Sequence, residues 1–255
     1  MKTYGLIGFP LSHSFSHNYF AEKFKHSTIS DCEFKNFPLE DINDFSALMK
    51  SNPTICGLSV TIPHKQSVIK CLDELDESAK EVGAVNCIRI QHPASSIQKL
   101  VGYNTDIFGF EKSLMPLLTS YHTHALILGT GGASKAIQYV LRKIKIDYYL
   151  VSRMKSQNSI SKTYADLNKE IISTHSIIVN TTPLGMFPNI NECPPIPYQH
   201  LTGQHLLYDL TYNPEESLFL KKGKENDAQI KNGLEMLHLQ AEKAWEIWNS
   251  PAKNE

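Results

Sequence analysis

The sequence predicts an α/β fold of two α/β domains, and three observations support this prediction. Short apolar segments alternate with segments of helical periodicity along the chain, which is typical of a mainly parallel sheet. A glycine-rich turn at residues 129–134 joins a buried strand to a helix, as in Rossmann-type units. The polar stretch 119–123 separates this unit from the preceding segments, and 255 residues suffice for two domains.

The N-terminal half begins with a strand at residues 4–9, and the next loop carries Ser14 and Ser16 before a helix that extends to about residue 26. Ser16 is well placed to cap this helix. Paired serines at a helix start commonly cap and turn, but their hydroxyls can also bind a carboxylate. The next expected elements are strands at 32–37 and 55–61, helices at 41–50 and 66–82, and a hairpin of residues 84–90 and 99–104.

The strand at residues 55–61 has candidate functional residues at its carboxyl end. Pro63 ends the strand, so Thr61 and Lys65 lie at the edge where open α/β sheets bind ligands. A lysine at the start of a helix is electrostatically unfavourable, because the helix N-terminus already carries partial positive charge. An ordinary surface lysine is the common explanation for any single lysine, but this unfavourable position favours a functional role for Lys65. Asp106 opens the next helix, and capping is the ordinary explanation for an aspartate there.

The glycine-rich turn follows the apolar strand 125–128 and precedes a helix with one apolar face. Glycine allows close approach of the backbone to a pyrophosphate, and the helix N-terminus favours negative charge. An ordinary strand-to-helix turn is the alternative, because Ser134 stands where the fingerprint has glycine or alanine. The following strand, 148–151, leads to Arg153. This residue can contact the 2′-phosphate of NADP, helped by Lys155, or it can be an ordinary exposed arginine in a loop, and the spacing favours neither interpretation.

The remaining chain continues the alternation. The expected elements are a helix at 163–172, strands at 176–181 and 206–211, a surface loop at 189–197 and a last helix from residue 234. Asp209, Leu210 and Tyr212 lie at the end of the later strand. Pro214 is expected to open a helix with acidic residues in its first turn, and Asn232 is expected to cap the last helix.

Composition excludes several functional classes. Lys and Arg number 25 against 26 Asp and Glu, so a net charge of −1 gives no electrostatic case for nucleic acid or an anionic membrane. We expect no signal peptide, because the N-terminal residues lack an apolar h-region, and no apolar stretch approaches the roughly 20 residues of a bilayer span. The five cysteines are scattered and the eleven histidines show no ligand spacing, so we expect a reduced cytoplasmic protein without a metal.

Seven motifs occur in an order and spacing that resembles the shikimate dehydrogenase family over nearly the whole chain. They are residues 8–16 (GFPLSHSFS), 59–65 (SVTIPHK), 83–86 (GAVN), 102–106 (GYNTD), 129–134 (GTGGAS), 180–186 (NTTPLGM) and 208–212 (YDLTY), with Gly233 and Gln240 after them. The resemblance implies a substrate domain of residues 1–105 plus 235–255, a dinucleotide domain of residues 106–234, and an active site in the cleft between them. It also implies interconversion of 3-dehydroshikimate and shikimate with NADP, without nucleic acid or membrane partners, by a monomer or homodimer.

The resemblance also implies roles for individual residues. Lys65 would be the proton donor and Asp106 would orient it. The implied substrate contacts are Ser14 and Ser16 to the carboxylate, Thr61, Lys65, Asn86, Asp106 and Gln240 to the ring, and Tyr212 closing the pocket. The implied cofactor contacts are Gly129, Thr130, Gly131, Gly132, Ala133 and Ser134 to the pyrophosphate, Arg153 to the 2′-phosphate, and Leu210 and Gly233 beside the nicotinamide. Two alternatives stay open: a quinate/shikimate dehydrogenase that uses NAD, and a non-catalytic module that senses shikimate or NADP.

Overall fold

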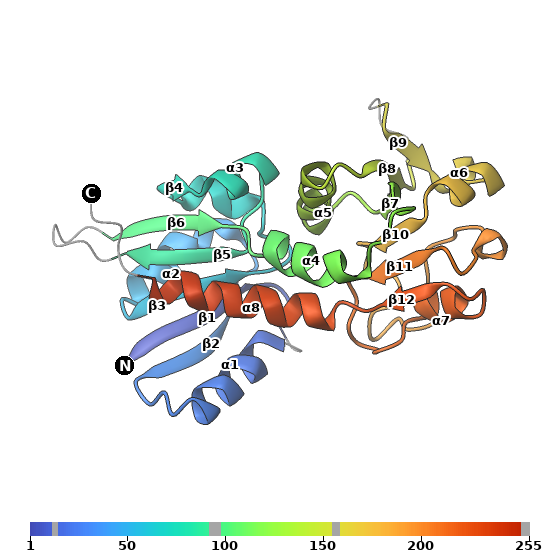
Figure 1. The fold of residues 1–255 in the computed structure, drawn as a ribbon. Coiled ribbons are helices and arrows are strands. Elements are labelled where there is room, and N and C mark those ends of the chain that lie inside the picture. Colours follow the sequence, from blue (N-terminus) through green and yellow to red (C-terminus); the bar gives the residue numbers. More distant parts are fainter. Residues whose placement is uncertain (12–14, 92–97, 155–158, 251–255) are drawn as a thin grey trace. The chain divides into compact units, whose positions relative to one another are not determined.

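The computed structural model describes residues 1–11, 15–91, 98–154 and 159–250. The chain forms two compact units, each built on its own six-stranded sheet (Figure 1). The first unit comprises Met1–Thr105 and Gln240–Glu255, and the second comprises Asp106–Leu239. The predicted α/β class with two sheets is confirmed. No helix among the described residues has the length and apolar character needed to cross a bilayer.

The first sheet has the strand order β2-β1-β3-β5-β6-β4. Its strands are β1 (Lys2–Gly8), β2 (Cys32–Pro38), β3 (Ile55–Val60), β4 (Glu74–Leu75), β5 (Cys87–Gln91) and β6 (Lys99–Tyr103). β1 pairs with β2 and β3 in parallel, and β4 pairs with β6 in parallel. β5 is antiparallel to both β3 and β6, so the predicted hairpin is confirmed. Because β5 runs the other way, its first residues lie at the carboxyl edge of β3.

Helices cover both faces of this sheet. They are α1 (Phe15–His26), α2 (Phe45–Ser51), α3 (Glu77–Val82) and the C-terminal part of α8 (Leu234–Asn249), with short 3-10 turns at Ile42–Asp44 and Ser67–Cys71. Alternation along β1 directs Ile7 into a cluster with Phe45 of α2, whereas Tyr4 joins an aromatic cluster on the other face. Trp248 of α8 belongs to that aromatic cluster, so the last helix completes the first core.

The second sheet is entirely parallel, with the order β12-β11-β10-β7-β8-β9. Its strands are β7 (His124–Leu128), β8 (Asp147–Ser152), β9 (Ser161–Thr163), β10 (Ile177–Asn180), β11 (Leu206–Asp209) and β12 (Gln229–Lys231). Its helices are α4 (Asp106–Leu114), α5 (Gly132–Lys143), α6 (Lys169–Thr174), α7 (Leu218–Lys224) and the start of α8, with 3-10 turns at Met115–Leu117, Tyr164–Asp166 and Tyr198–His200. The carboxyl ends of its central strands meet at one edge, as in Rossmann-type sheets.

Two predicted helices of the first unit differ from the structure. The predicted helix at 66–82 is wrong: a 3-10 turn ends at Cys71, β4 pairs with β6, and only Glu77–Val82 is α-helical. The backbone N–H of Leu100 donates to Asp73 at 2.7 Å, which helps hold this segment against the sheet. The first helix begins at Phe15, so Ser16 lies inside its first turn and does not cap it.

Two predicted helices of the second unit are also shorter or displaced. The segment at 163–172 contains the end of β9, a 3-10 turn closed by a capping box of Thr163 and Asp166, and only then α6. Pro214 does not open a helix: α7 begins at Leu218, because the hydroxyl of Ser217 caps it by accepting from the N–H of Leu220 at 3.4 Å.

Candidate active site

In the first unit, Thr61 lies where β1 and β3 end together. Its N–H donates to the carbonyl of Ile7 at 2.9 Å. A Cβ placed on Gly8 would lie only 2.4 Å from Cγ2 of Thr61, so glycine is needed for this close approach. Thr61 is therefore held at the carboxyl edge of the first sheet, as the sequence predicts.

The backbone of Lys65 is fixed between β3 and β5. The N–H of Val85 donates to the carbonyl of Lys65 at 2.7 Å, immediately before Asn86. The neighbouring His64 is buried, with its Nε2 2.6 Å from the carbonyl oxygen of Leu39. These bonds fix the turn that presents the half-buried Lys65 side chain at the same edge as Thr61.

Three side chains form a hydrogen-bonded group at this edge: Asn86, Thr105 and Gln240. Oδ1 of Asn86 accepts from the N–H of Thr105 at 2.6 Å, and Nδ2 of Asn86 donates to the hydroxyl oxygen of Thr105 at 3.0 Å. Oε1 of Gln240 accepts from Nδ2 of Asn86 at 3.4 Å and from the hydroxyl of Thr105 at 3.3 Å. Polar groups that are far apart in the chain are thus oriented as one set of donors and acceptors for a polyhydroxylated ligand.

The remaining predicted substrate residues lie in different places. Ser16 is buried in the first turn of α1, and Ser14 is outside the described residues. Asp106 is the buried first residue of α4 and follows Thr105 directly. Tyr212 follows β11 and is half-buried, and burial raises the pKa of its phenol above the ordinary value, so it is a neutral hydroxyl at neutral pH.

In the second unit, β7, the glycine-rich turn and α5 form the predicted strand–turn–helix. Gly129 has φ +108, and a Cβ there would lie 2.7 Å from Oγ1 of Thr181, so a larger residue is excluded. Gly131 is the N-cap of α5, and a Cβ at this position would meet nothing within 4 Å. The turn therefore leaves open space at a helix N-terminus, which fits the pyrophosphate of a dinucleotide.

Ser134 stands where the dinucleotide-binding fingerprint has glycine or alanine, and its side chain fits the turn. It is fully buried, and its hydroxyl donates to the carbonyl of Gly131 at 2.7 Å. The hydroxyl thus satisfies its own hydrogen bond inside the helix start. Thr130 is exposed, Gly132 and Ala133 begin α5, and Arg153 is exposed directly after β8, while Lys155 is outside the described residues. The exposed guanidinium is a suitable partner for a phosphate.

Leu210 and Gly233 lie against each other. A Cβ on Gly233 would lie 2.1 Å from the carbonyl oxygen of Leu210, so the two backbones are in direct contact. The N–H of Gly233 also donates to the carbonyl of Thr211 at 3.0 Å. These two predicted cofactor residues therefore form one surface next to the end of β11.

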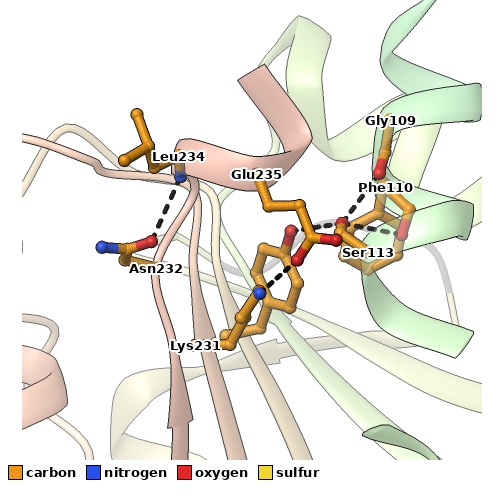
Figure 2. A network of polar contacts seen from close by, with 8 residues as sticks. Gly109, Phe110, Ser113, Lys231, Asn232, Leu234 and Glu235 are labelled. Atoms are coloured by element: carbon orange, nitrogen blue, oxygen red, sulfur yellow. Dashed lines mark hydrogen bonds and ion pairs between the residues drawn. The ribbon is translucent and has the colours of Figure 1, made fainter. Parts of the chain in front are cut away.

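The start of α8 is fixed by its own polar contacts (Figure 2). Oδ1 of Asn232 accepts from the N–H of Leu234 at 3.2 Å, so the predicted cap is confirmed. Glu235 forms an ion pair with Lys231, the last residue of β12. On the neighbouring α4, Ser113 donates to the carbonyl of Gly109 at 2.7 Å and lies 2.7 Å from the phenol oxygen of Tyr208.

The described residues contain no group of three or more His, Cys, Asp or Glu that could hold a metal.

Comparison with known proteins identifies the family. Residues 6–88 match the family model for the shikimate dehydrogenase substrate binding domain. The shikimate dehydrogenase (NADP(+)) of Clostridium beijerinckii is 39% identical over 259 residues, which cover 97% of this chain and 92% of the relative. The chain belongs to the shikimate dehydrogenase family.

Solved structures agree with this membership. A shikimate dehydrogenase crystallised in complex with NADP+ has a TM-score of 0.85 and 30% identity to this chain, covering 100% of this chain and 92% of the other. Shikimate dehydrogenase 1 from Peptoclostridium difficile has a TM-score of 0.82 and 36% identity, covering 100% and 94% of the two chains. The family resemblance inferred from the motifs is thereby confirmed.

Sequence reasoning does not predict which residues join the candidate site residues within each unit. Thr105 belongs to the motif at residues 102–106 with no individual role implied for it, yet it forms hydrogen bonds with Asn86 and Gln240. Asn180 and Asp209 occur in quoted motifs, yet no role was predicted for either, and both are fully buried and joined by a 3.0 Å hydrogen bond. A polar residue that ends a buried strand is the only sequence signal that distinguishes them.

Proposed function

We propose that this chain catalyses the reversible reduction of 3-dehydroshikimate to shikimate with NADP as the cofactor. The observation that carries this proposal is the relationship to a shikimate dehydrogenase (NADP(+)) over 97% of the chain at 39% identity. The hydrogen-bonded group of Asn86, Thr105 and Gln240 supports it, because a ring with several hydroxyls needs such oriented partners.

Substrate binding is assigned to the edge of the first sheet. Ser14 and Ser16 hold the carboxylate, and Thr61, Asn86 and Gln240 accept or donate hydrogen bonds to the ring hydroxyls. Tyr212 closes the pocket with its neutral phenol. The contacts that orient Asn86 and Gln240 before substrate arrives reduce the ordering needed on binding, which favours affinity.

Catalysis is assigned to Lys65 and Asp106. When bound, NADPH supplies the hydride that attacks the carbonyl carbon. Lys65 donates a proton to the oxygen that becomes the hydroxyl, and it accepts that proton in the reverse direction. Asp106 accepts hydrogen bonds and orients the ammonium group and the substrate. The hydrogen bond from the N–H of Val85 to the carbonyl of Lys65 fixes the backbone from which this side chain extends, next to Asn86.

Cofactor binding is assigned to the second unit. Residues 129–134 receive the pyrophosphate, since the space above Gly131 is open and the helix N-terminus attracts the charge. Arg153 binds the 2′-phosphate, which selects NADP over NAD. Leu210 and Gly233 border the nicotinamide. For assembly and location, we propose a monomer or homodimer in the cytoplasm, where its five free cysteines stay reduced.

Steady-state oxidation of shikimate with NADP, followed by nicotinamide absorbance, tests this function. We expect strong turnover with shikimate and NADP, and little with NAD or with quinate as controls. Comparable rates with NAD or quinate would instead indicate the quinate/shikimate dehydrogenase. Absence of turnover with cofactor binding still detectable would indicate the sensing module.

Lys65→Ala tests the proton donor. We expect kcat to fall about 10²- to 10⁴-fold, the usual contribution of general acid–base catalysis, while the affinities for shikimate and NADP change little. Lys70→Ala is the matched control, because Lys70 is exposed on the same segment and its ammonium contacts Asn43 at 3.0 Å. A Lys65→Ala variant that turns over like the Lys70→Ala variant would contradict the assigned role.

A further inference from the structure

Asp209 is a fully buried carboxylate at the end of β11, with donors from three segments converging on it. Its Oδ1 accepts from Nδ2 of Asn180 and from the N–H of Thr211, each at 3.0 Å. Its Oδ2 accepts from the hydroxyl of Ser217. Burying a carboxylate is unfavourable unless its oxygens are hydrogen-bonded, so this group is stable only while the three segments stay in place.

On one side, these contacts lead to the glycine-rich turn. Oδ1 of Asn180 accepts from the N–H of Thr182 at 3.0 Å and from its hydroxyl at 2.7 Å. The preceding Thr181 donates its hydroxyl to the carbonyl of Leu128 at 2.7 Å, directly before Gly129. The same hydroxyl oxygen would be 2.7 Å from a Cβ on Gly129. The segment that begins at Asn180 is therefore bonded directly to the end of β7, where the glycine-rich turn starts.

On the other side, the contacts lead to the surface formed by Leu210 and Gly233. Leu210 lies between Asp209 and Thr211 in the chain, and the N–H of Thr211 donates to the carboxylate of Asp209. The N–H of Leu210 donates to the carbonyl of Asn180 at 3.0 Å, and the carbonyl of Thr211 accepts from Gly233 at 3.0 Å. The direction of the Leu210 carbonyl against Gly233 is thus determined by bonds that begin at Asp209 and Asn180.

We propose that Asp209 is a positioning residue that holds the Leu210–Gly233 surface in register with the glycine-rich turn, so that both ends of the dinucleotide are bound together. The proposal rests on the proposed function, since it takes NADP as the dinucleotide. A carboxylate suits this place because it accepts from all three donors. The amide of asparagine would direct an N–H group at one of them, and that contact would be lost or reversed.

Equilibrium binding of two nucleotides to the whole protein tests this role. NADP spans both surfaces, whereas adenosine 2′,5′-bisphosphate lacks the nicotinamide half and does not reach Leu210 and Gly233. We expect Asp209→Asn to weaken NADP binding about tenfold, because a displaced Leu210–Gly233 surface loses contact with the nicotinamide half, and to change the affinity for the bisphosphate less than about twofold. Ser217→Ala removes one donor and leaves the carboxylate, so we expect the same selective loss at about threefold.

Ser176→Ala is the matched control, because it removes a buried hydroxyl that donates to Tyr121 at the amino end of β10. Its affinity for both nucleotides should equal that of the wild type. If Asp209→Asn lowers the affinity for both nucleotides equally, the proposal is overturned and Asp209 has a general structural role. If the affinity of Asp209→Asn for NADP is unchanged, the proposal is also overturned. If Asp209→Asn does not fold, Ser217→Ala decides by the same criterion. Wild-type protein that binds no NADP would refute the proposed function itself.

Discussion

Gly131→Ala separates cofactor binding from stability. Gly131 has φ −74 and ψ −176, an extended conformation that alanine adopts freely, and its Cβ would meet no atom within 4 Å. The substitution therefore introduces no clash into the protein itself. We expect the free energy of unfolding to change by less than about 1 kcal/mol, which covers both the helix-cap and the chain-entropy effects of the change.

In the proposed cofactor site, the added methyl group would occupy the space assigned to the pyrophosphate. If it moves the phosphate away from two backbone N–H groups, the loss is about 3 kcal/mol, or about a hundredfold in the dissociation constant. Calorimetric titration with NADP, together with urea unfolding of the free protein, measures both quantities. Gly203→Ala is the control, because its Cβ would meet only the carbonyl of Asp227 at 3.6 Å. NADP affinity equal to that of the control would refute the assignment of the pyrophosphate to this turn.

Three further predictions concern stability. Gly233→Ala should lower the free energy of unfolding by about 1–3 kcal/mol in urea, because its Cβ would lie 2.1 Å from the carbonyl oxygen of Leu210 and one backbone must move; an unchanged midpoint would contradict this packing. Gly57→Ala should lower it by a similar 1–3 kcal/mol or so and change tryptophan fluorescence, since its Cβ would lie 2.4 Å from the indole of Trp248; an unaltered emission spectrum would count against it. Burial raises the pKa of Asp209 to about 6, so its stabilising contribution is complete below pH of about 4 and is lost as the pH rises through 6. In urea unfolding, the free energy of unfolding of the wild type should therefore fall by about 2–3 kcal/mol relative to that of Asp209→Asn between pH of about 4 and about 6. If the free energies of the two proteins change in parallel with pH, the raised pKa is excluded.

Local patterns predicted the parts of the fold that local interactions decide. The apolar strand β7, the glycine turn and α5 were predictable, because burial, backbone freedom and helical periodicity all act within a few residues. The cap at Asn232 was predictable for the same reason. The segment 66–82 was not, because β4 exists only through its pairing with β6, and no local signal reveals a partner that far along the chain.

The candidate site divides in a similar way. Thr61 and Lys65 could be placed at a sheet edge from Pro63 and the strand pattern, and Asn86 and Gln240 entered only through the family motifs. That Thr105 joins the last two by hydrogen bonds depends on where β6 ends and α8 begins, which only the folded chain determines. The convergence of Asn180, Thr211 and Ser217 on Asp209 is likewise a product of the fold.

The position of α8 has a consequence for synthesis of the chain on the ribosome. Trp248 stacks on Tyr4 with ring centroids 5.1 Å apart, so a strand made before the second unit is buried against a helix made after it. The second unit, by contrast, is one uninterrupted segment, Asp106–Leu239. The nascent chain can therefore complete its second core while the first core still lacks Trp248, and the first core is complete only once α8 has left the ribosome. During that interval, the apolar side chains of the early segment are exposed, and such surface is prone to aggregation.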